Sequence, residues 1–122
     1  MATRSAREVL ADHLRLAQAG EVEADLARNF APDVVLLSAY GVFRGHEGVR
    51  RAARLLAAQL PGGRWEYRTV LVEGELGFLE WGGRGTDGVR VEDGADSFVI
   101  RDGRIRAMTM HYTVLPPATS RS

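Results

Sequence analysis

The chain has 122 residues with 16 basic and 16 acidic side chains and no cysteine, a length that suits one domain with a single hydrophobic core. Balanced charge argues against a nucleic-acid-binding surface and against a polybasic patch for an anionic membrane. A small neutral or weakly polar molecule is therefore the expected partner. The lack of cysteine excludes disulfides, thiolate metal sites and a cysteine nucleophile.

Three helices are predicted in the first half of the chain. Ser5 and Glu8 have the S-x-x-E spacing of a capping box, which opens the first helix, and Gly20 is a suitable end for it. A shorter second helix is indicated over 22–30, where apolar residues recur every four positions before a proline. The third helix is predicted over 46–60, which is followed by a Pro-Gly-Gly stop.

The other segments predict strands. Residues 33–45 contain β-branched and aromatic residues around a predicted turn at 39–41, which indicates two short strands. Four further strands are predicted after the third helix, over 64–74, 75–85, 89–100 and 104–114. Asp-Gly dipeptides at 87–88 and 102–103 suit two-residue hairpin turns, because both central residues of a type I′ turn need positive φ. A long antiparallel meander is therefore expected.

Helices followed by a run of hairpins predict an α+β domain in which the helices cover one face of a curved antiparallel sheet. We expect this single domain to span residues 1–115, with residues 116–122 as a disordered polar tail. Three helices can cover only part of such a sheet. Either a hollow remains between the layers, or a second subunit covers the outer face.

Asp96 is the unusual residue of the predicted meander, because it shares a strand with Phe98 and Ile100. With the period of two along a strand, all three point inward if any one does. Across the Asp-Gly turn, the inward set that matches this phase is Met108, Met110, Tyr112 and Val114. Burial among these groups would raise the pKa of a carboxyl and make Asp96 a candidate acid or hydrogen-bond donor. Alternatively, "EDGAD" is a loop and Asp96 is its solvated last residue.

The order of elements, together with "NFAPDVVLLSAYGVFRGHEGVRRAA" and "DSFVIRDGRIRAMTMHYT", resembles the nuclear transport factor 2-like (NTF2-like) superfamily. The resemblance is closest to its SnoaL-like polyketide cyclase and ketosteroid isomerase branches and covers about residues 6 to 115. It implies a cone-shaped barrel made of a strongly curved antiparallel sheet, with the three helices on its concave face. It also implies a homodimer formed through the sheet.

The resemblance assigns roles to three positions. His13 stands where ketosteroid isomerases carry a tyrosine, Ser38 where they carry the general-base aspartate, and Asp96 where they carry a second aspartate. That second aspartate stays protonated in an apolar site and donates a hydrogen bond to the developing oxyanion. The implied catalytic set is Asp96 as the acid or oxyanion donor, His13 as partner base or second donor, and Ser38 as an auxiliary polar contact. Ser38 has no carboxylate, which argues against classical steroid isomerisation.

His13 falls on the apolar stripe of the first predicted helix, where, without the resemblance, a histidine at the edge of the core that hydrogen-bonds to the backbone is the commoner case. Its unperturbed pKa of about 6.5 suits an acid or a base. The candidate substrate-binding residues, which would supply flat or soft apolar surface, are Tyr40, Trp81, Phe98, Met108, Met110 and Tyr112. Three scattered histidines match no metal motif, so neither a metal nor a cofactor is expected.

The leading hypothesis is a cofactor-independent enzyme that binds a small apolar, cyclic carbonyl compound and catalyses its cyclisation, isomerisation or dehydration. The alternative is a non-catalytic ligand-binding or dimerisation module of the same fold, since two of the three family positions have changed. No stretch of the sequence reaches the roughly 18 apolar residues of a membrane span, and the first ten residues lack a signal-peptide core. A cytoplasmic location is therefore expected.

Overall fold

The computed structural model of the chain describes residues 3–118. Its elements are α1 (Ala6–Ala19), α2 (Val22–Asn29), β1 (Phe30–Ser38), β2 (Gly41–Arg44), α3 (Gly45–Gln59), β3 (Arg64–Glu73), β4 (Leu76–Arg84), β5 (Arg90–Arg101) and β6 (Arg104–His111). Every predicted helix and strand is present, with ends shifted by a few residues. Within the described range, no helix is both long enough and apolar enough to cross a membrane.

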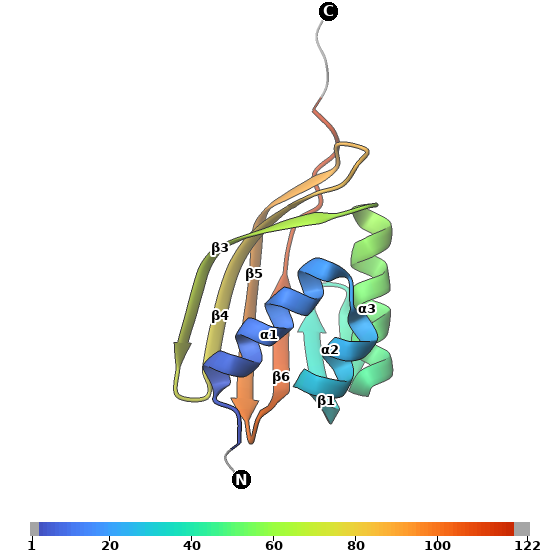
Figure 1. The fold of residues 1–122 in the computed structure, drawn as a ribbon. Coiled ribbons are helices and arrows are strands. Elements are labelled where there is room, and N and C mark those ends of the chain that lie inside the picture. Colours follow the sequence, from blue (N-terminus) through green and yellow to red (C-terminus); the bar gives the residue numbers. More distant parts are fainter. Residues whose placement is uncertain (1–2, 119–122) are drawn as a thin grey trace, which may run out of the picture.

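One curved sheet contains all six of the described strands, in the order β2-β1-β6-β5-β4-β3. The meander from β3 to β6 is antiparallel, as predicted. β1 then pairs in parallel with β6, with Leu36 beside Met108, a pairing that the sequence did not predict. The sheet curves strongly but stays open, with β2 and β3 as its edges, so the predicted cone is an open one (Figure 1).

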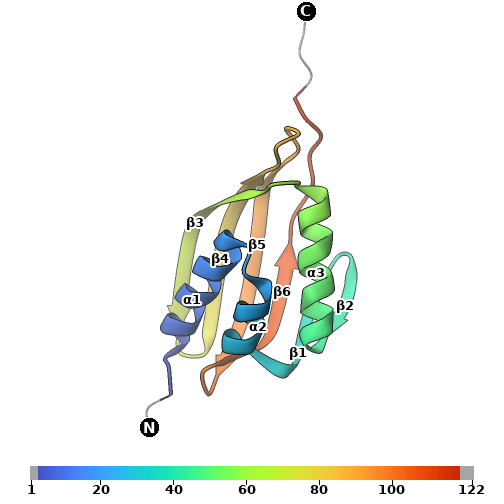
Figure 2. The same ribbon diagram turned by 45° about the vertical axis from the view of Figure 1, so that its right-hand side comes forward.

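The three helices lie on one face of this sheet (Figures 1 and 2). α1 begins at the predicted capping box, where the Ser5 hydroxyl accepts from the Glu8 backbone N–H at 3.1 Å and the Glu8 carboxylate accepts from the Ser5 backbone N–H at 2.9 Å. It ends at Gly20, which adopts the left-handed conformation with φ 72°. The buried stripe of α1 includes His13, so the helix places this histidine against the sheet.

The two Asp-Gly turns have different geometries. Asp102 and Gly103 have φ values of 53° and 72°, and they form the predicted two-residue turn between β5 and β6. The same prediction at 87–88 is wrong, because residues 85–89 form a longer loop and only Gly88 has positive φ there. The Asp87 carboxylate instead accepts from the Val89 backbone N–H at 3.0 Å, which stabilises the wider loop.

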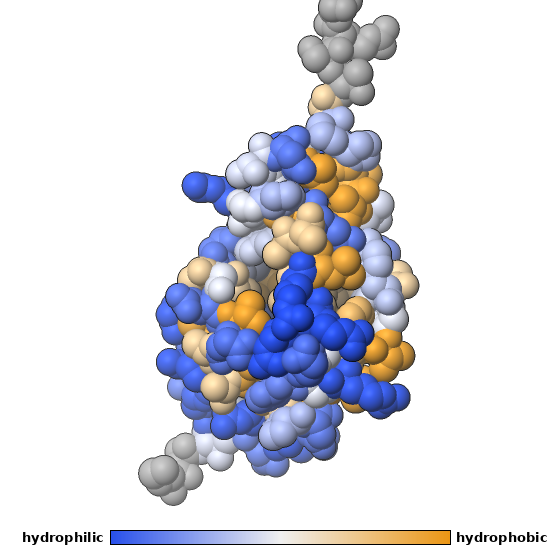
Figure 3. Space-filling view, turned by 90° about the vertical axis from the view of Figure 1, so that its right-hand side faces the viewer, coloured by the Kyte–Doolittle hydropathy of each residue, from blue (hydrophilic) through white to orange (hydrophobic). Residues whose placement is uncertain are grey.

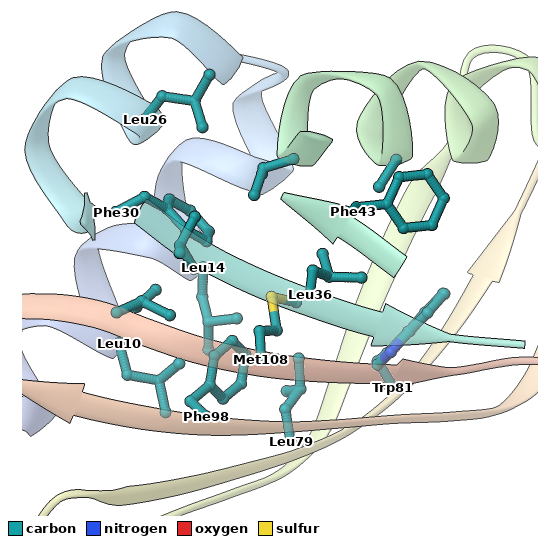
Figure 4. Close-up of a cluster of buried hydrophobic side chains, with 14 of the residues drawn as sticks. Leu10, Leu14, Leu26, Phe30, Leu36, Phe43, Leu79, Trp81, Phe98 and Met108 are labelled. Carbon is teal, nitrogen blue, oxygen red and sulfur yellow. The ribbon is translucent and has the colours of Figure 1, made fainter. Parts of the chain in front are cut away.

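The hydrophobic core lies between the helices and the sheet. Figure 4 shows side chains from β1, β4, β5 and β6 that meet those of the helices, among them Leu10, Leu14, Leu26, Phe30, Leu36, Leu79, Trp81, Phe98 and Met108. Trp81 on β4 pairs with Gly94 on β5. A Cβ atom at position 94 would lie 2.3 Å from the indole ring, so the glycine provides the space for the ring.

The outer side of α3 is hydrophilic and carries three arginines. Arg50 donates to Glu23 and to Glu47, both at 2.6 Å, and Arg51 and Arg54 are exposed. Figure 3, which faces this side of the molecule, shows hydrophilic side chains across the centre and the lower part of the surface, with separate hydrophobic patches above them and to either side. The arginines therefore form a solvated helix face.

The predicted tail, 116–122, falls mostly outside the described residues. Leu115 forms an isolated bridge with Arg90, and the Pro116 carbonyl accepts from the Arg90 guanidinium at 2.7 Å. Residues 119–122 lie outside the described part of the chain. The end of the domain that is described is therefore held against the start of β5.

Candidate functional site

A cavity of about 270 Å³ lies between the helices and the concave face of the sheet. Its walls are mainly apolar side chains from α1, α2, α3 and the strands, including Leu36, Leu56 and Trp65. The side chains in its lining that can ionise are His13, Asp25, Tyr67 and Asp96. The Tyr67 hydroxyl donates to the Leu14 carbonyl at 2.8 Å, and burial raises its pKa to about 12. The histidine and the two aspartates remain as candidates for proton transfer.

Asp96 lies on β5 with its side chain buried, only 5% exposed. Residues 92–96 belong to the strand, so the alternative of a solvated loop residue is wrong and the inward phase is confirmed. One carboxylate oxygen, Oδ1, accepts from the Trp81 indole N–H at 2.9 Å. Burial raises the pKa of Asp96 to about 7, although the Trp81 hydrogen bond and the nearby His13 charge act to lower it. A substantial fraction of Asp96 is therefore protonated near neutral pH.

His13 is also buried, 8% exposed, and its partner is a carboxylate and not the backbone. Its Nδ1 atom lies 2.7 Å from Oδ2 of Asp25 on α2. The imidazole packs edge-to-face with the rings of Phe30 and Phe98, with centroid distances of 5.4 and 5.6 Å. The other ring nitrogen, Nε2, takes no part in the hydrogen bond to Asp25.

Asp25 was not predicted as a site residue, and it belongs to a buried polar network. Asn29 donates from Nδ2 to Asp25 Oδ1 and to Asp12 Oδ2, both at 2.9 Å. Both Asp25 and Asn29 fall in phase with the apolar residues of α2, since Asp25 lies three residues after Val22 and Asn29 three residues after Leu26. Polar residues on the buried stripe of a short helix are a signal that could have identified them.

Asp12 is the anchor of the network near the surface. Burial raises its pKa, but hydrogen bonds from Arg15 and Asn29 and the charge of Arg28 outweigh burial and lower the pKa to about 2. Asp12 is therefore an anion at all ordinary pH values. Across residues 3–118, no group of three or more histidine or acidic side chains is arranged to hold a metal ion.

Two polar atoms remain free at the cavity. Among residues 3–118, neither Nε2 of His13 nor Oδ2 of Asp96 has a hydrogen-bond partner, while every inaccessible polar side-chain atom there has one. Both atoms are therefore accessible, and the cavity is the space that both side chains line. The His13 charge is close enough to lower the pKa of Asp96. The cavity thus offers one nitrogen and one carboxyl oxygen to a ligand.

The predicted site residues divide into two groups. His13, Asp96, Trp81, Met108 and Met110 line the cavity. Ser38, Tyr40, Phe98 and Tyr112 are not part of the lining. The first group alone is brought together around one space.

The second group has other structural roles. Ser38 ends β1, and its hydroxyl accepts from the Tyr40 backbone N–H at 3.0 Å, which stabilises the turn into β2. Tyr40 is 47% exposed, and its ring packs against that of Tyr112 with a centroid distance of 5.5 Å. The Tyr112 hydroxyl donates to the Gln59 side-chain oxygen at 2.6 Å. Phe98 is buried, and its ring makes the edge contact with His13. Turn and core contacts account for all four side chains.

Comparison with solved structures shows the fold. A protein from Kribbella flavida DSM 17836, provisionally assigned as a ketosteroid isomerase, has a TM-score of 0.75 at 16% identity, over 98% of this chain and 84% of the other. A provisional polyketide cyclase from Sinorhizobium meliloti has a TM-score of 0.67 at 20% identity, over 84% and 93%. An NTF2-like protein of unknown function from Burkholderia xenovorans LB400 has a TM-score of 0.70 at 18% identity, over 95% and 87%.

The sequence itself matches one family. No curated protein matches the chain. The family model of the SnoaL-like domain matches residues 10–108, which run from within α1 to within β6 and include both free cavity groups, His13 and Asp96. With this match and its NTF2-like fold, the chain belongs to the SnoaL-like domain family.

Proposed function

We propose that this protein is a cofactor-independent enzyme that binds an apolar cyclic carbonyl compound in the cavity and performs acid–base chemistry on it. The reaction class is cyclisation, isomerisation or dehydration. One observation carries the proposal: His13 Nε2 and Asp96 Oδ2 are both free in the same apolar cavity. A fold with a packed interior would favour the non-catalytic module, and the open cavity favours the enzyme.

The common step of these reactions is removal of a proton next to a carbonyl group. Neutral Asp96 donates its carboxyl proton to the carbonyl oxygen, while Nε2 of His13 takes a proton from the adjacent carbon. The C–H bond breaks, its electrons form the enol double bond, and the new enol O–H completes the balance. Apolar walls strengthen both polar contacts because they exclude water.

The size of the cavity limits the substrate. At about 270 Å³ it lies just below the range of roughly 300–1,000 Å³ typical of ligand pockets. Met108, Met110 and Trp81 supply soft and flat surface in its lining. We therefore expect a molecule of one or two rings.

Deuterium exchange tests this function without knowledge of the natural substrate. In D₂O, the wild-type protein is expected to accelerate exchange of the protons next to the carbonyl of 1-tetralone or cyclohexanone. Proton NMR measures this exchange as the loss of their signals. Positioned acid–base groups contribute roughly 10²–10⁴-fold to such a step. Exchange at the buffer rate for both ketones would contradict the enzyme. If a ketone shifted the Trp81 indole signal without any acceleration of exchange, that result would favour the ligand-binding module.

We also propose that two copies associate through the outer face of the sheet. That face carries no helix and holds an apolar groove of about 410 Å³, lined by residues that include Val35, Leu37, Leu71 and Leu76. Leu71 and Leu76 are 60% and 64% exposed. Exposed apolar surface of this extent is typical of an interface.

Sedimentation velocity is expected to show a dimer for the wild-type protein and a monomer for Leu71→Glu. The reason is that burial of a charge in an apolar interface costs on the order of several kcal/mol of association free energy. Leu71→Met, which keeps the apolar surface, serves as the matched control and should remain dimeric. A wild-type protein that is monomeric at high concentration would rule out this association.

A further inference from the structure

The buried pair of His13 and Asp25 is the strongest polar contact at the cavity that the proposed reaction has not used. The two residues are on different helices, α1 and α2, and their side chains are 11% and 9% exposed. Their 2.7 Å contact joins Nδ1 to Oδ2. The pair therefore fixes how the imidazole ring is turned towards the cavity.

The orientation of Asn29 determines which oxygen of Asp25 is available to the histidine. Its Oδ1 accepts from the Arg4 guanidinium at 3.0 Å, and its Nδ2 donates to Asp25 and Asp12. A guanidinium can only donate and an ionised carboxylate can only accept, so the amide of Asn29 cannot be reversed. Asp25 Oδ1 is thus occupied, and Oδ2 remains for His13.

The network is anchored at its outer end. Arg28 binds Asp12 through two hydrogen bonds, of 2.9 and 3.0 Å, and Arg15 adds a third of 2.8 Å. Asp12 in turn holds one hydrogen of the Asn29 amide, which leaves the other for Asp25. Every donor and acceptor between the surface and His13 therefore has a defined partner.

We propose that Asp25 is a positioning residue that holds neutral His13 as the Nδ1–H tautomer, with the lone pair of Nε2 facing the cavity. A carboxylate oxygen accepts only, so the proton of the neutral ring must be on Nδ1. Given the proposed function, on which this last step rests, His13 is then the base and Asp96 the acid. Asp25 does not touch the substrate and acts through the imidazole.

The tautomer can be measured in the wild-type protein without any ligand. Long-range ¹H–¹⁵N correlation spectra separate protonated from unprotonated ring nitrogens, and at about pH 8 an ordinary imidazole is neutral. We expect His13 to show a protonated Nδ1 and an unprotonated Nε2, with its signals assigned by their loss in His13→Gln. His46 is an internal reference of the opposite kind, since its Nε2 donates to the Phe30 carbonyl at 2.9 Å. A protonated Nε2 on His13 would overturn the proposal.

Asp25→Asn provides the second arm. Asn29 still donates to position 25, so the new amide must place its oxygen there and its NH₂ towards His13. An NH₂ group can only donate, so Nδ1 must accept and the proton moves to Nε2. We expect the NMR pattern of His13 to reverse, and exchange of 1-tetralone to fall about 10²-fold through loss of the base. An unchanged tautomer, or full exchange with a reversed tautomer, would contradict the proposal.

Glu21→Gln is the matched control, because it makes the same carboxylate-to-amide change at an exposed position that begins α2 and makes no side-chain cap. It should leave both the tautomer and the exchange rate as in the wild type. The two proposals fail separately. An Nδ1–H tautomer without any wild-type exchange would contradict the proposed function alone, whereas exchange with an Nε2–H tautomer would contradict the role of Asp25 and that of Nε2 of His13 as the base, but not the enzyme itself.

Discussion

Asp96→Asn is expected to lower the rate of ketone exchange by about 10²–10⁴-fold, the contribution of a positioned general acid that transfers a proton. The asparagine oxygen can still accept from the Trp81 indole, which is 2.9 Å from Oδ1 in the wild type. Its NH₂ group then faces the cavity in place of the carboxyl. An amide can donate a hydrogen bond to a carbonyl oxygen but cannot transfer a proton to it, so the fold remains and the chemistry is lost.

Glu80→Gln is the control for this variant. Glu80 lies on β4 beside Trp81, but it is exposed and points away from the cavity, so the same change in chemistry should leave exchange unaffected. The pH profile gives a second readout. If neutral Asp96 is the acid, kcat/KM should decline above about pH 7, where its carboxyl ionises. Undiminished exchange in Asp96→Asn would remove Asp96 from the mechanism.

Asp96 should also make the free energy of unfolding depend on pH. Its pKa is about 7 in the folded protein against an ordinary 3.8, so the folded state binds this proton more tightly than the unfolded state. Below about pH 4 the Asp96 carboxyl leaves the free energy of unfolding unchanged. As the pH rises towards 7 the carboxyl lowers that free energy, and above pH 7 the reduction is complete. A difference of about three pH units in pKa corresponds to about 4 kcal/mol.

Urea unfolding of wild type and Asp96→Asn at about pH 4 and pH 8 measures this cost, since an amide does not ionise. The stability of the variant relative to wild type should increase by up to about 4 kcal/mol between the two pH values. Comparison within the pair cancels the pH dependence of all other groups. Glu80→Gln should show a constant difference from wild type, and parallel curves for Asp96→Asn would mean that the buried carboxyl has an ordinary pKa.

Several features of the fold follow from local sequence. The helix α1 is set by Ser5, Glu8 and Gly20, whose backbone and capping preferences act within a few residues. The β5–β6 hairpin follows in the same way from Asp102 and Gly103. The same rule failed for the Asp-Gly pair at 87–88, where a side-chain hydrogen bond within the loop favoured a wider turn.

The candidate site was predictable only in part. Strand period two correctly placed Asp96 inside, and helical period placed His13 on the buried stripe of α1. The residue that binds His13 was missed, because Asp25 comes from another helix. Ser38 was predicted from the resemblance to ketosteroid isomerases, but its hydroxyl binds the turn that follows it. A position matched along the chain does not specify which way a side chain at a strand end will face.

The sequence by itself determined the secondary structure, the meander, the side of the sheet on which Asp96 lies and the resemblance to the SnoaL-like family, because these depend on periodicity and on backbone preferences of neighbouring residues. Tertiary structure alone decided the parallel pairing of β1 with β6, the His13–Asp25 contact and the open cavity between the layers. Periodicity shows which residues are buried. Which of them meet, and whether the side chains fill the space between helices and sheet, depends on packing between segments that are distant in sequence.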